Sequence, residues 1–254
     1  MKISIITVTY NSAATLADTL KTVRDQDYAD VEHVLVDGAS SDGTVDIIKQ
    51  FPHVQNWVSE KDAGLYDAIN KGIRMATGDV IGILNSDDFF PNTGVLSAIS
   101  KAFEKDIDAV FGDIAFVHPG NLNKVIRLYS SKKFHPGRFA YGFMPAHPSF
   151  YVKRSCYNSM GLYQTDYKIA ADYELLMRFI YRFKISTTYL PAILVYMRTG
   201  GVSNANLLSR VTLNKEIIKA CKENGVTTNM AILSLKYFTK VFEFIKPMLR
   251  PIGK

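Results

Sequence analysis

The sequence centres on residues 80–88, which read Val80-Ile81-Gly82-Ile83-Leu84-Asn85-Ser86-Asp87-Asp88. The apolar run is short, as is typical of a buried strand, and two adjacent carboxylates follow it. Neighbouring side chains of a strand point to opposite faces, so Asp87 and Asp88 can serve one site only if the backbone has turned. Buried carboxylates need a cation, and Mg²⁺ or Mn²⁺ binds one or two of them together with water and phosphate oxygens. We expect a divalent ion and a nucleotide diphosphate here; the alternative is a solvated turn before a helix.

Strand and helix patterns alternate up to this point. We expect strands over 3–9, 31–36, 54–58 and 80–85, with helices over about 15–26, from Thr44 as the cap, and over about 66–76. Such units predict an α/β fold with a parallel sheet between helices. Ligands bind outside the carboxyl ends of parallel strands, and Asp37, Asp62, Asp87 and Asp88 all follow strands. These four carboxylates should therefore converge on one crevice.

The pattern changes after a predicted helix at 95–103. Strand patterns at 108–116, 124–130 and 148–153 are separated by turns, and a brief helix is expected at 154–159. Helix 173–181, strand 187–197 and two terminal helices follow. This half predicts mixed or antiparallel additions to the sheet.

Composition limits the class of protein. The 254 residues, 47% of them hydrophobic, suffice for one large core. No apolar run is long enough to span a membrane, and residues 3–8 are too short for a signal-peptide core, so we expect a cytoplasmic protein. Two cysteines, Cys156 and Cys221, are too few for a disulfide framework or a zinc site and are interpreted as packing residues.

Charge is distributed unevenly along the chain. Residues 1–120 hold 9 Lys and Arg against 18 Asp and Glu, a net of −9, whereas residues 121–254 hold 21 against 6, a net of +15. The second half is thus expected to meet an anionic membrane surface, a phosphate-bearing substrate or nucleic acid. It contains no nucleic-acid recognition motif, so no nucleic-acid partner is predicted.

Five motifs together resemble the family 2 inverting glycosyltransferases of the GT-A fold. In the family's order they are Val8-Thr9-Tyr10-Asn11, Val36-Asp37-Gly38-Ala39-Ser40-Ser41-Asp42-Gly43-Thr44, Asp62-Ala63-Gly64 with Ala68-Ile69-Asn70-Lys71-Gly72, Ser86-Asp87-Asp88, and Ala171-Asp172-Tyr173-Glu174. Each motif alone is weak evidence, but five in order are strong. Gly38 departs from the pattern, because many relatives carry a second acidic residue there. The resemblance implies a Rossmann-like nucleotide-binding mixed sheet, with bacterial surface-polysaccharide enzymes as the nearest group.

The resemblance also implies roles for single residues on the donor side. Asp37 would accept a hydrogen bond from the base, expected to be uracil, and Asp87 would face the ribose. The remaining donor-pocket residues would be Thr9, Tyr10, Asp62, Gly64 and Asn70. The alternatives are that Thr9 and Tyr10 only close a strand, and that Asn70 only ties a helix to a loop.

The resemblance assigns the metal to Asp88, and inverting transfer needs a general base. Asp172 is the candidate base, because the amino end of a helix keeps a carboxylate ionised; a helix cap is the alternative and Glu174 the fallback base. His147, in a Pro-rich turn, is a second candidate metal ligand or acceptor contact, with a structural role as the alternative. The loop with Arg198, Gly200, Gly201 and Ser203 resembles a mobile cover over the donor, or is an ordinary turn.

These motifs divide the chain into a GT-A domain at 1–203, with a nucleotide-sugar half at about 1–117 and an acceptor half at about 118–203, and a helical extension at 204–254. In that extension apolar residues recur at steps of three and four, at Ile232, Leu235, Phe238, Phe242, Ile245 and Leu249. This stripe should dock on its own domain, on a second copy in a homodimer, or on the inner face of the cell membrane.

The expected function is metal-dependent transfer of a hexosyl group from a nucleotide sugar, with a UDP-sugar as the expected donor, to a glycan or lipid-linked acceptor in polysaccharide biosynthesis. A nucleotidyltransferase would share the carboxylates, but it would normally carry a Gly-rich phosphate loop where this chain has Tyr10-Asn11-Ser12. A non-catalytic nucleotide-sugar-binding module is the third candidate.

Overall fold

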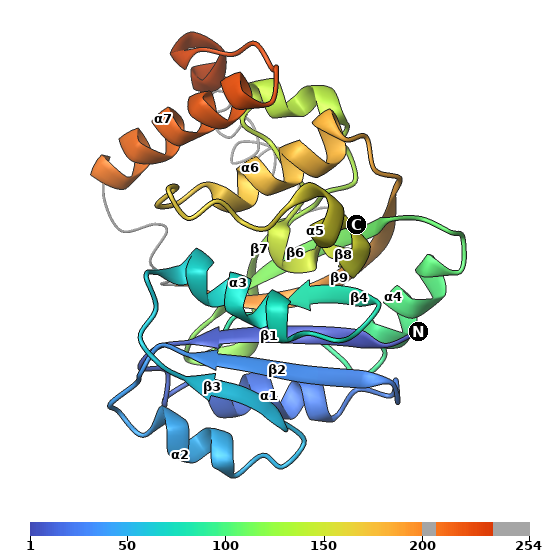
Figure 1. The fold of residues 1–254 in the computed structure, drawn as a ribbon, viewed down its shortest axis with the longest axis vertical. Coiled ribbons are helices and arrows are strands. Elements are labelled where there is room, and N and C mark those ends of the chain that lie inside the picture. The colour runs from blue at the N-terminus through green and yellow to red at the C-terminus, as the bar shows by residue number, and fades with distance from the viewer. Residues whose placement is uncertain (200–206, 236–254) are drawn as a thin grey trace, which may run out of the picture.

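The first half of the protein alternates strands and helices as the apolar periodicity predicts (Figure 1). The computed structural model describes residues 1–199 and 207–235. In chain order the elements of this half are β1 (Ile3–Thr9), α1 (Leu16–Arg24), β2 (Val31–Asp37), α2 (Thr44–Lys49), β3 (Asn56–Ser59), α3 (Leu65–Met75), β4 (Val80–Ile83), β5 (Asp88–Phe89) and α4 (Val95–Phe103). Strands β1 and β4 are buried at every position, because helices cover both faces of the sheet there.

The second half adds strands to the same sheet. Its elements are β6 (Ala109–His118), β7 (Asn121–Tyr129), 3₁₀ helices at Pro136–Tyr141 and His147–Ser149, β8 (Tyr151–Lys153), α5 (Arg154–Met160), α6 (Ala171–Met177), a π-helical turn at Arg178–Arg182, β9 (Thr187–Arg198) and α7 (Leu207–Glu223). The nine-stranded sheet has the order β3-β2-β1-β4-β8-β6-β9-β5, and β7 pairs with β6.

Strand directions bring the predicted site residues to one edge. β1 is parallel to β2 and β4, and β2 is parallel to β3. β8 is antiparallel to both β4 and β6, so β6 runs in the direction of β4, and β9 is parallel to β6. The carboxyl ends of β1 to β4, β6 and β9 therefore lie at the same edge of the sheet, which we call the carboxyl edge. The predicted mixed α/β sheet is confirmed.

Alternating side chains of β1 divide the core into two layers. Ile6 and Val8 pack with α3, α5, α6 and α7 on one face of the sheet. Ile3 and Ile5 pack with α1 and α4 on the other face, and α2 lies beside α1 there (Figure 1). Cys156 and Cys221 are free thiols buried in the first layer, where they act as packing residues.

Several local expectations need correction. The strand expected from Pro148 begins only at Tyr151, because 147–149 form a 3₁₀ turn; Pro148 lacks the N–H that a strand ladder needs. Thr44 was expected to be the cap of α2, but it is the first helical residue, and Gly43, with φ +93°, is the cap. The Thr44 hydroxyl donates a hydrogen bond to the Asp42 carboxylate. The predicted helix 173–181 changes to a π turn after Met177.

The carboxyl-terminal part of the described chain packs on α6. Ala220 and Cys221 of α7 are fully buried, and so is Leu233, which lies among the helical residues 230–235. Of the predicted stripe, Ile232 is half-buried and Leu235 is 50% exposed, so Leu233 rather than the stripe faces the core. The stripe positions from Phe238 to Leu249 lie outside the described residues. None of the helices within 1–199 and 207–235 is long and apolar enough to cross a bilayer.

Candidate active site

Asp88 is held at the carboxyl edge by contacts from three directions. It opens the two-residue strand β5, which pairs with Met197 of β9. Its N–H donates to the Asn85 carbonyl at 3.0 Å, and its own carbonyl accepts the Thr19 hydroxyl of α1 at 2.7 Å. The residue is 1% exposed, so the solvated turn considered from the sequence is not observed. The backbone turn that the adjacent carboxylates require is therefore present.

The Asp88 carboxylate is incompletely paired. Oδ2 accepts the Asn85 side-chain amide at 3.3 Å, whereas Oδ1 is buried without a partner among the described residues. Burial, together with the charge of Asp87, raises the pKa of Asp88 to about 8. A buried carboxylate of this kind is stabilised by a bound cation.

His147 and Asp172 form a pair next to Asp88. His147 Nδ1 lies 3.0 Å from Asp172 Oδ2, and the two side chains are 33% and 14% exposed. Burial lowers the pKa of His147, but the charges of Asp172 and Asp88 outweigh it, so the net shift is upward. Asp172 is the second residue of α6, as predicted, and its Oδ1 accepts the Tyr173 N–H at 2.7 Å. The structure thus brings into contact two predicted site residues that are 25 positions apart in the sequence.

The donor set fits a divalent ion that takes few protein ligands. The unpartnered Oδ1 of Asp88 is a suitable oxygen, and His147 is the neighbouring nitrogen donor. Within the described parts of the chain, no three His, Cys, Asp or Glu side chains gather closely enough to hold a metal on their own. Substrate phosphate oxygens and water would have to complete the coordination, as is common for Mg²⁺.

Asp37 closes β2 at the same edge and is fully buried. Its Oδ2 accepts the Ser40 N–H at 3.0 Å and the Ser59 hydroxyl at 2.5 Å, and its Oδ1 accepts the Ser40 hydroxyl. All these partners come from the carboxyl ends of β2 and β3. A nucleotide base can therefore reach Asp37 only if the Ser40 side chain moves.

Three of the other predicted donor-pocket residues, Thr9, Tyr10 and Asp62, lie around Gly38. A Cβ on Gly38 would lie 3.1 Å from Asp62 Oδ2 and 3.4 Å from the Tyr10 ring, so a larger residue would crowd both. Tyr10 is 66% exposed, whereas Thr9 is buried and its hydroxyl has no partner among the described residues. Asp62 pairs with Lys71 Nζ at 2.6 Å, and Gly64 caps α3 at φ +131°. The solvent-exposed Tyr10 ring thus lies beside the Asp62 carboxylate, whose charge is balanced by Lys71.

Two predicted residues have structural contacts instead. Both polar ends of the Asn70 side chain bond the backbone of Tyr163, at 2.8 and 3.0 Å, so Asn70 ties α3 to a distant loop. The fallback base Glu174 is 1% exposed and binds Arg178 at 2.9 and 3.0 Å. Asp87 is half-buried, and its carbonyl accepts Arg198 Nη1 at 2.6 Å.

Sequence reasoning missed the contacts of three supporting groups. Arg198, expected in a loop that covers the donor or in an ordinary turn, is instead the last residue of β9. Arg198 also binds Asp18 at 2.6 Å, so it ties β9 to α1 and to the turn before Asp88. Glu216 of α7 accepts the N–H groups of residues 168, 169 and 170 at 2.8 to 2.9 Å, which fixes the loop that precedes Asp172. The third is the Glu174–Arg178 pair, whose i,i+4 spacing was readable in the sequence.

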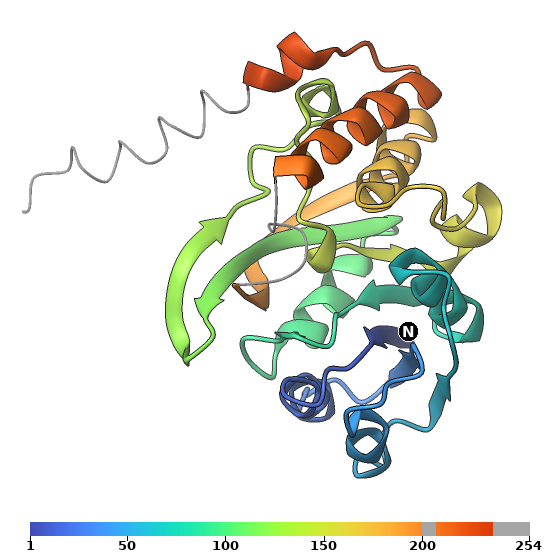
Figure 2. The same cartoon turned by 90° about the vertical axis from the view of Figure 1, so that its left-hand side faces the viewer.

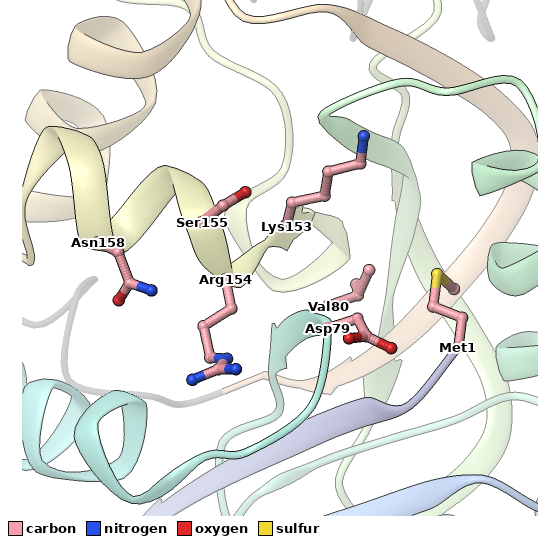
Figure 3. A pocket seen from close by; sticks show the side chains of 7 residues that line it. All are labelled: Met1, Asp79, Val80, Lys153, Arg154, Ser155 and Asn158. Carbon is pink, nitrogen blue, oxygen red and sulfur yellow. The ribbon is translucent and has the colours of Figure 1, made fainter.

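A pocket of about 400 Å³ lies elsewhere. Its lining residues are Met1, Asp79, Val80, Lys153, Arg154, Ser155 and Asn158 (Figure 3). Met1 and Val80 stand at the amino ends of β1 and β4, so this pocket is at the sheet edge opposite Asp88. The Arg154 side chain donates a hydrogen bond to the Gly78 carbonyl at 2.9 Å, and Lys153 forms an ion pair with Asp106 at 2.9 Å. We therefore place this pocket outside the candidate active site.

Comparisons with solved structures agree on the fold. S. aureus TarS 1–349 in complex with UDP-GlcNAc superposes with a TM-score of 0.69 at 19% identity, over 92% of this chain and 70% of that one. In another S. aureus TarS structure, the matched region is 43% of that chain. A mannosyltransferase from Pyrobaculum calidifontis in complex with GDP-Man and Mn²⁺ gives a TM-score of 0.62 at 17% identity, over 97% and 81%. The GT-A expectation is confirmed.

Sequence comparisons give the family. An uncharacterized glycosyltransferase of Mycobacterium tuberculosis is 31% identical over 186 residues, 69% of this chain and 68% of that protein. A PGL/p-HBAD biosynthesis glycosyltransferase of Mycobacterium bovis is 28% identical over 223 residues, 85% and 82%. The model of the family described as Glycosyl transferase family 2 matches residues 4–162. The chain is therefore a glycosyltransferase and belongs to glycosyl transferase family 2.

Proposed function

We propose that this glycosyltransferase moves a sugar, with inversion at C1, from a UDP-sugar to a hydroxyl group of a glycan or a lipid-linked acceptor in polysaccharide assembly. Mn²⁺ or Mg²⁺ is the proposed cofactor. The observation that carries the proposal is the buried Asp88 carboxylate, whose Oδ1 has no partner among the described residues and whose charge acts on His147 of the His147–Asp172 pair.

The donor is proposed from the carboxyl edge and from the solved relatives. The TarS structures hold UDP-GlcNAc or UDP, and the mannosyltransferase holds GDP-Man and Mn²⁺. In this protein the exposed Tyr10 ring beside Gly38 offers a stacking surface for a base, and Asp37 offers a carboxylate for its N–H groups. We expect uridine, with guanosine as the competing nucleotide.

In the proposed transfer, Asp172 accepts the proton of the acceptor hydroxyl. The acceptor oxygen forms a bond to C1 of the sugar from the face opposite the diphosphate, the bond from C1 to the diphosphate oxygen breaks, and its electron pair leaves with UDP. His147 donates its Nδ1–H to Asp172 at 3.0 Å and so orients the carboxylate. Asp88 and His147 would hold the divalent ion, which when bound stabilises negative charge on the diphosphate.

The protein's place in the cell follows from the same proposal. A lipid-linked acceptor requires contact with a membrane, and the surplus of positive charge in residues 121–254 favours an anionic surface. We propose a cytoplasmic protein that attaches peripherally to the inner face of the cell membrane. The contribution of the segment after residue 235, and of a homodimer, is left to experiment.

The test is a screen of UDP- and GDP-sugars for hydrolysis and transfer, with Mn²⁺, with Mg²⁺ and with a chelator. We expect release of free nucleotide diphosphate from a UDP-sugar only when a divalent ion is present, and inversion at C1 in the product. A nucleotidyltransferase would transfer the nucleotidyl group and release the sugar 1-phosphate instead, and a non-catalytic module would bind nucleotide sugar without turnover. Undiminished turnover with the chelator would overturn the metal requirement.

A further inference from the structure

The hairpin of β6 and β7 extends from the body of the protein (Figure 2). We call residues 114–129 the arm. In the described part of the chain β7 pairs with β6 alone, so its outer edge is open. The arm begins at Ile114, which lies against Val195 of β9; within the arm Phe116 lies against Met197, which in turn pairs with Asp88. It therefore rises from the carboxyl edge, two strands away from the candidate active site.

The arm exposes three large apolar side chains of β7. Val125, Ile126 and Leu128 are 46%, 52% and 53% exposed. Leu128 pairs with Ala115 and Val125 pairs with Val117, so both side chains lie on the same face, and Ile126 is the additional residue at the register shift between them. Such a clustered set of large aliphatic side chains on an extended element indicates a surface that meets an apolar partner.

The charge around the arm has a single sign. Between Asp113 and Asp166 the sequence contains no acidic residue. The same stretch holds seven basic residues: Lys124, Arg127, Lys132, Lys133, Arg138, Lys153 and Arg154. Lys124, Arg127, Lys132 and Lys133 are all exposed. The partner that complements aliphatic and basic side chains at once is an anionic lipid surface.

A second copy of the chain fits this surface less well. Edge strands pair with other chains most readily when they are flat and uncharged. Here the β6–β7 register is broken between Phe116 and Val117 and again between Val117 and His118. The edge also carries Lys124 and Arg127, so two arms side by side would place like charges together.

We propose that the arm is a membrane-docking element that inserts Val125, Ile126 and Leu128 at the surface of an anionic bilayer, while Lys124, Lys132 and Lys133 contact lipid headgroups. Docked in this way, the carboxyl edge with Asp88 and Asp172 lies next to the bilayer. The proposal rests on the proposed membrane-borne acceptor only for its purpose in the cell; lipid binding itself needs neither donor nor acceptor.

The experiment is flotation of the full-length protein with vesicles of phosphatidylcholine containing phosphatidylglycerol, and with vesicles of phosphatidylcholine alone. We expect binding to the anionic vesicles that weakens at high salt. The double variant I126D/L128D should bind at least about tenfold more weakly. The matched control V211D replaces an apolar residue of α7 that is 48% exposed and should float like wild type. Circular dichroism and UDP binding verify that each variant is folded.

The variant K124Q/K132Q/K133Q tests the charge independently and should lose about fivefold in affinity per lysine removed. Equal flotation of wild type and I126D/L128D on anionic vesicles would overturn the proposal, as would equal wild-type binding to neutral vesicles. Light scattering could instead show a dimer that I126D/L128D dissociates, with no vesicle binding by the wild type. That result would mean that the arm contacts a second copy of the chain. If the wild type binds anionic vesicles as expected but transfers no sugar, the result would count against the proposed function and not against the docking proposal.

Discussion

Two groups of carboxylates at the carboxyl edge are treated differently by the protein around them. On the nucleotide side, Asp37 receives three hydrogen bonds from Ser40 and Ser59, and Asp62 is paired with Lys71. On the transfer side, Asp88 keeps a buried oxygen without a partner in the described chain. The proposed nucleotide side is thus held by its own side chains, whereas the proposed transfer side leaves one buried carboxylate oxygen without a partner in the described chain.

Helix α6 shows the same difference at closer range. Asp172 and Glu174 are two residues apart, yet Asp172 is partly exposed beside His147 and Glu174 is buried against Arg178. The partners of a carboxylate, rather than its presence in a motif, therefore distinguish a reactive group from a structural one. The predictions below test this distinction.

The largest effect is expected from Asp172→Asn. The amide keeps the shape and a hydrogen bond to His147 but accepts no proton, so kcat should fall by about 10² to 10⁴. Calorimetry should show nearly unchanged UDP binding, because Asp172 lies on the transfer side. If UDP binding disappears together with turnover, Asp172 belongs to the donor pocket.

Glu174→Gln should act on stability. Removing one partner from the buried pair leaves Arg178 without its counter-charge, which costs about 3 kcal/mol of unfolding free energy. Urea unfolding of the wild type and the variant measures this cost. The folded fraction should retain near-normal kcat; a loss of kcat without a loss of stability would make Glu174 the base.

Asp37→Asn should weaken donor binding. A hydrogen bond to a charged acceptor contributes about 1.5 to 3 kcal/mol, so UDP affinity should fall by about 10- to 100-fold. At saturating donor, kcat should change little. Calorimetry with UDP and with GDP separates the effect on the base from a general loss of folding, and unchanged affinity would show that Asp37 only organises the Ser40 and Ser59 loops.

The smallest effect concerns His33, which contrasts with His147. Burial, assisted by His53, lowers the pKa of His33 to about 3 from the ordinary 6.5. Because the unfolded chain binds a proton that the folded protein excludes, stability is full above pH 6.5 and falls as pH drops towards 3. Between pH 7 and pH 5 the wild type should lose about 2 kcal/mol more than His33→Asn in urea unfolding. Equal losses would show that His33 is protonated in the folded state.

The fold was predictable wherever a residue pattern continued for a full element. The β-branched run of β1 and the apolar spacing of α4 (Val95–Phe103) determine those elements locally, and both were predicted within a residue. β5 was not predicted, because two residues carry no periodicity; it exists only through pairing with β9. The 3₁₀ turn at His147 depends on Pro148, which the expected strand took as its first residue.

The site was predictable in its residues and less so in its contacts. The position of Asp88 after an apolar strand indicated its burial at the carboxyl edge. The pairing of His147 with Asp172 has no sequence signal, because it depends on how α6 packs against the turn before β8. The partner of Asn70 comes from a distant part of the chain, and the environment of Glu174 depends in part on tertiary packing. Motif matching cannot detect such contacts, so it placed both residues in the functional set.

The central claim is that Asp88 is kept incomplete in order to bind a divalent ion. The most direct measurement is calorimetric titration of Mn²⁺ into the UDP-bound wild type and Asp88→Asn, together with thermal unfolding of both. The account predicts that Asp88→Asn loses Mn²⁺ binding and turnover while its melting temperature stays equal or rises, because the amide replaces a carboxyl group whose ionisation is disfavoured by burial. Wild-type Mn²⁺ affinity and turnover in Asp88→Asn would contradict it.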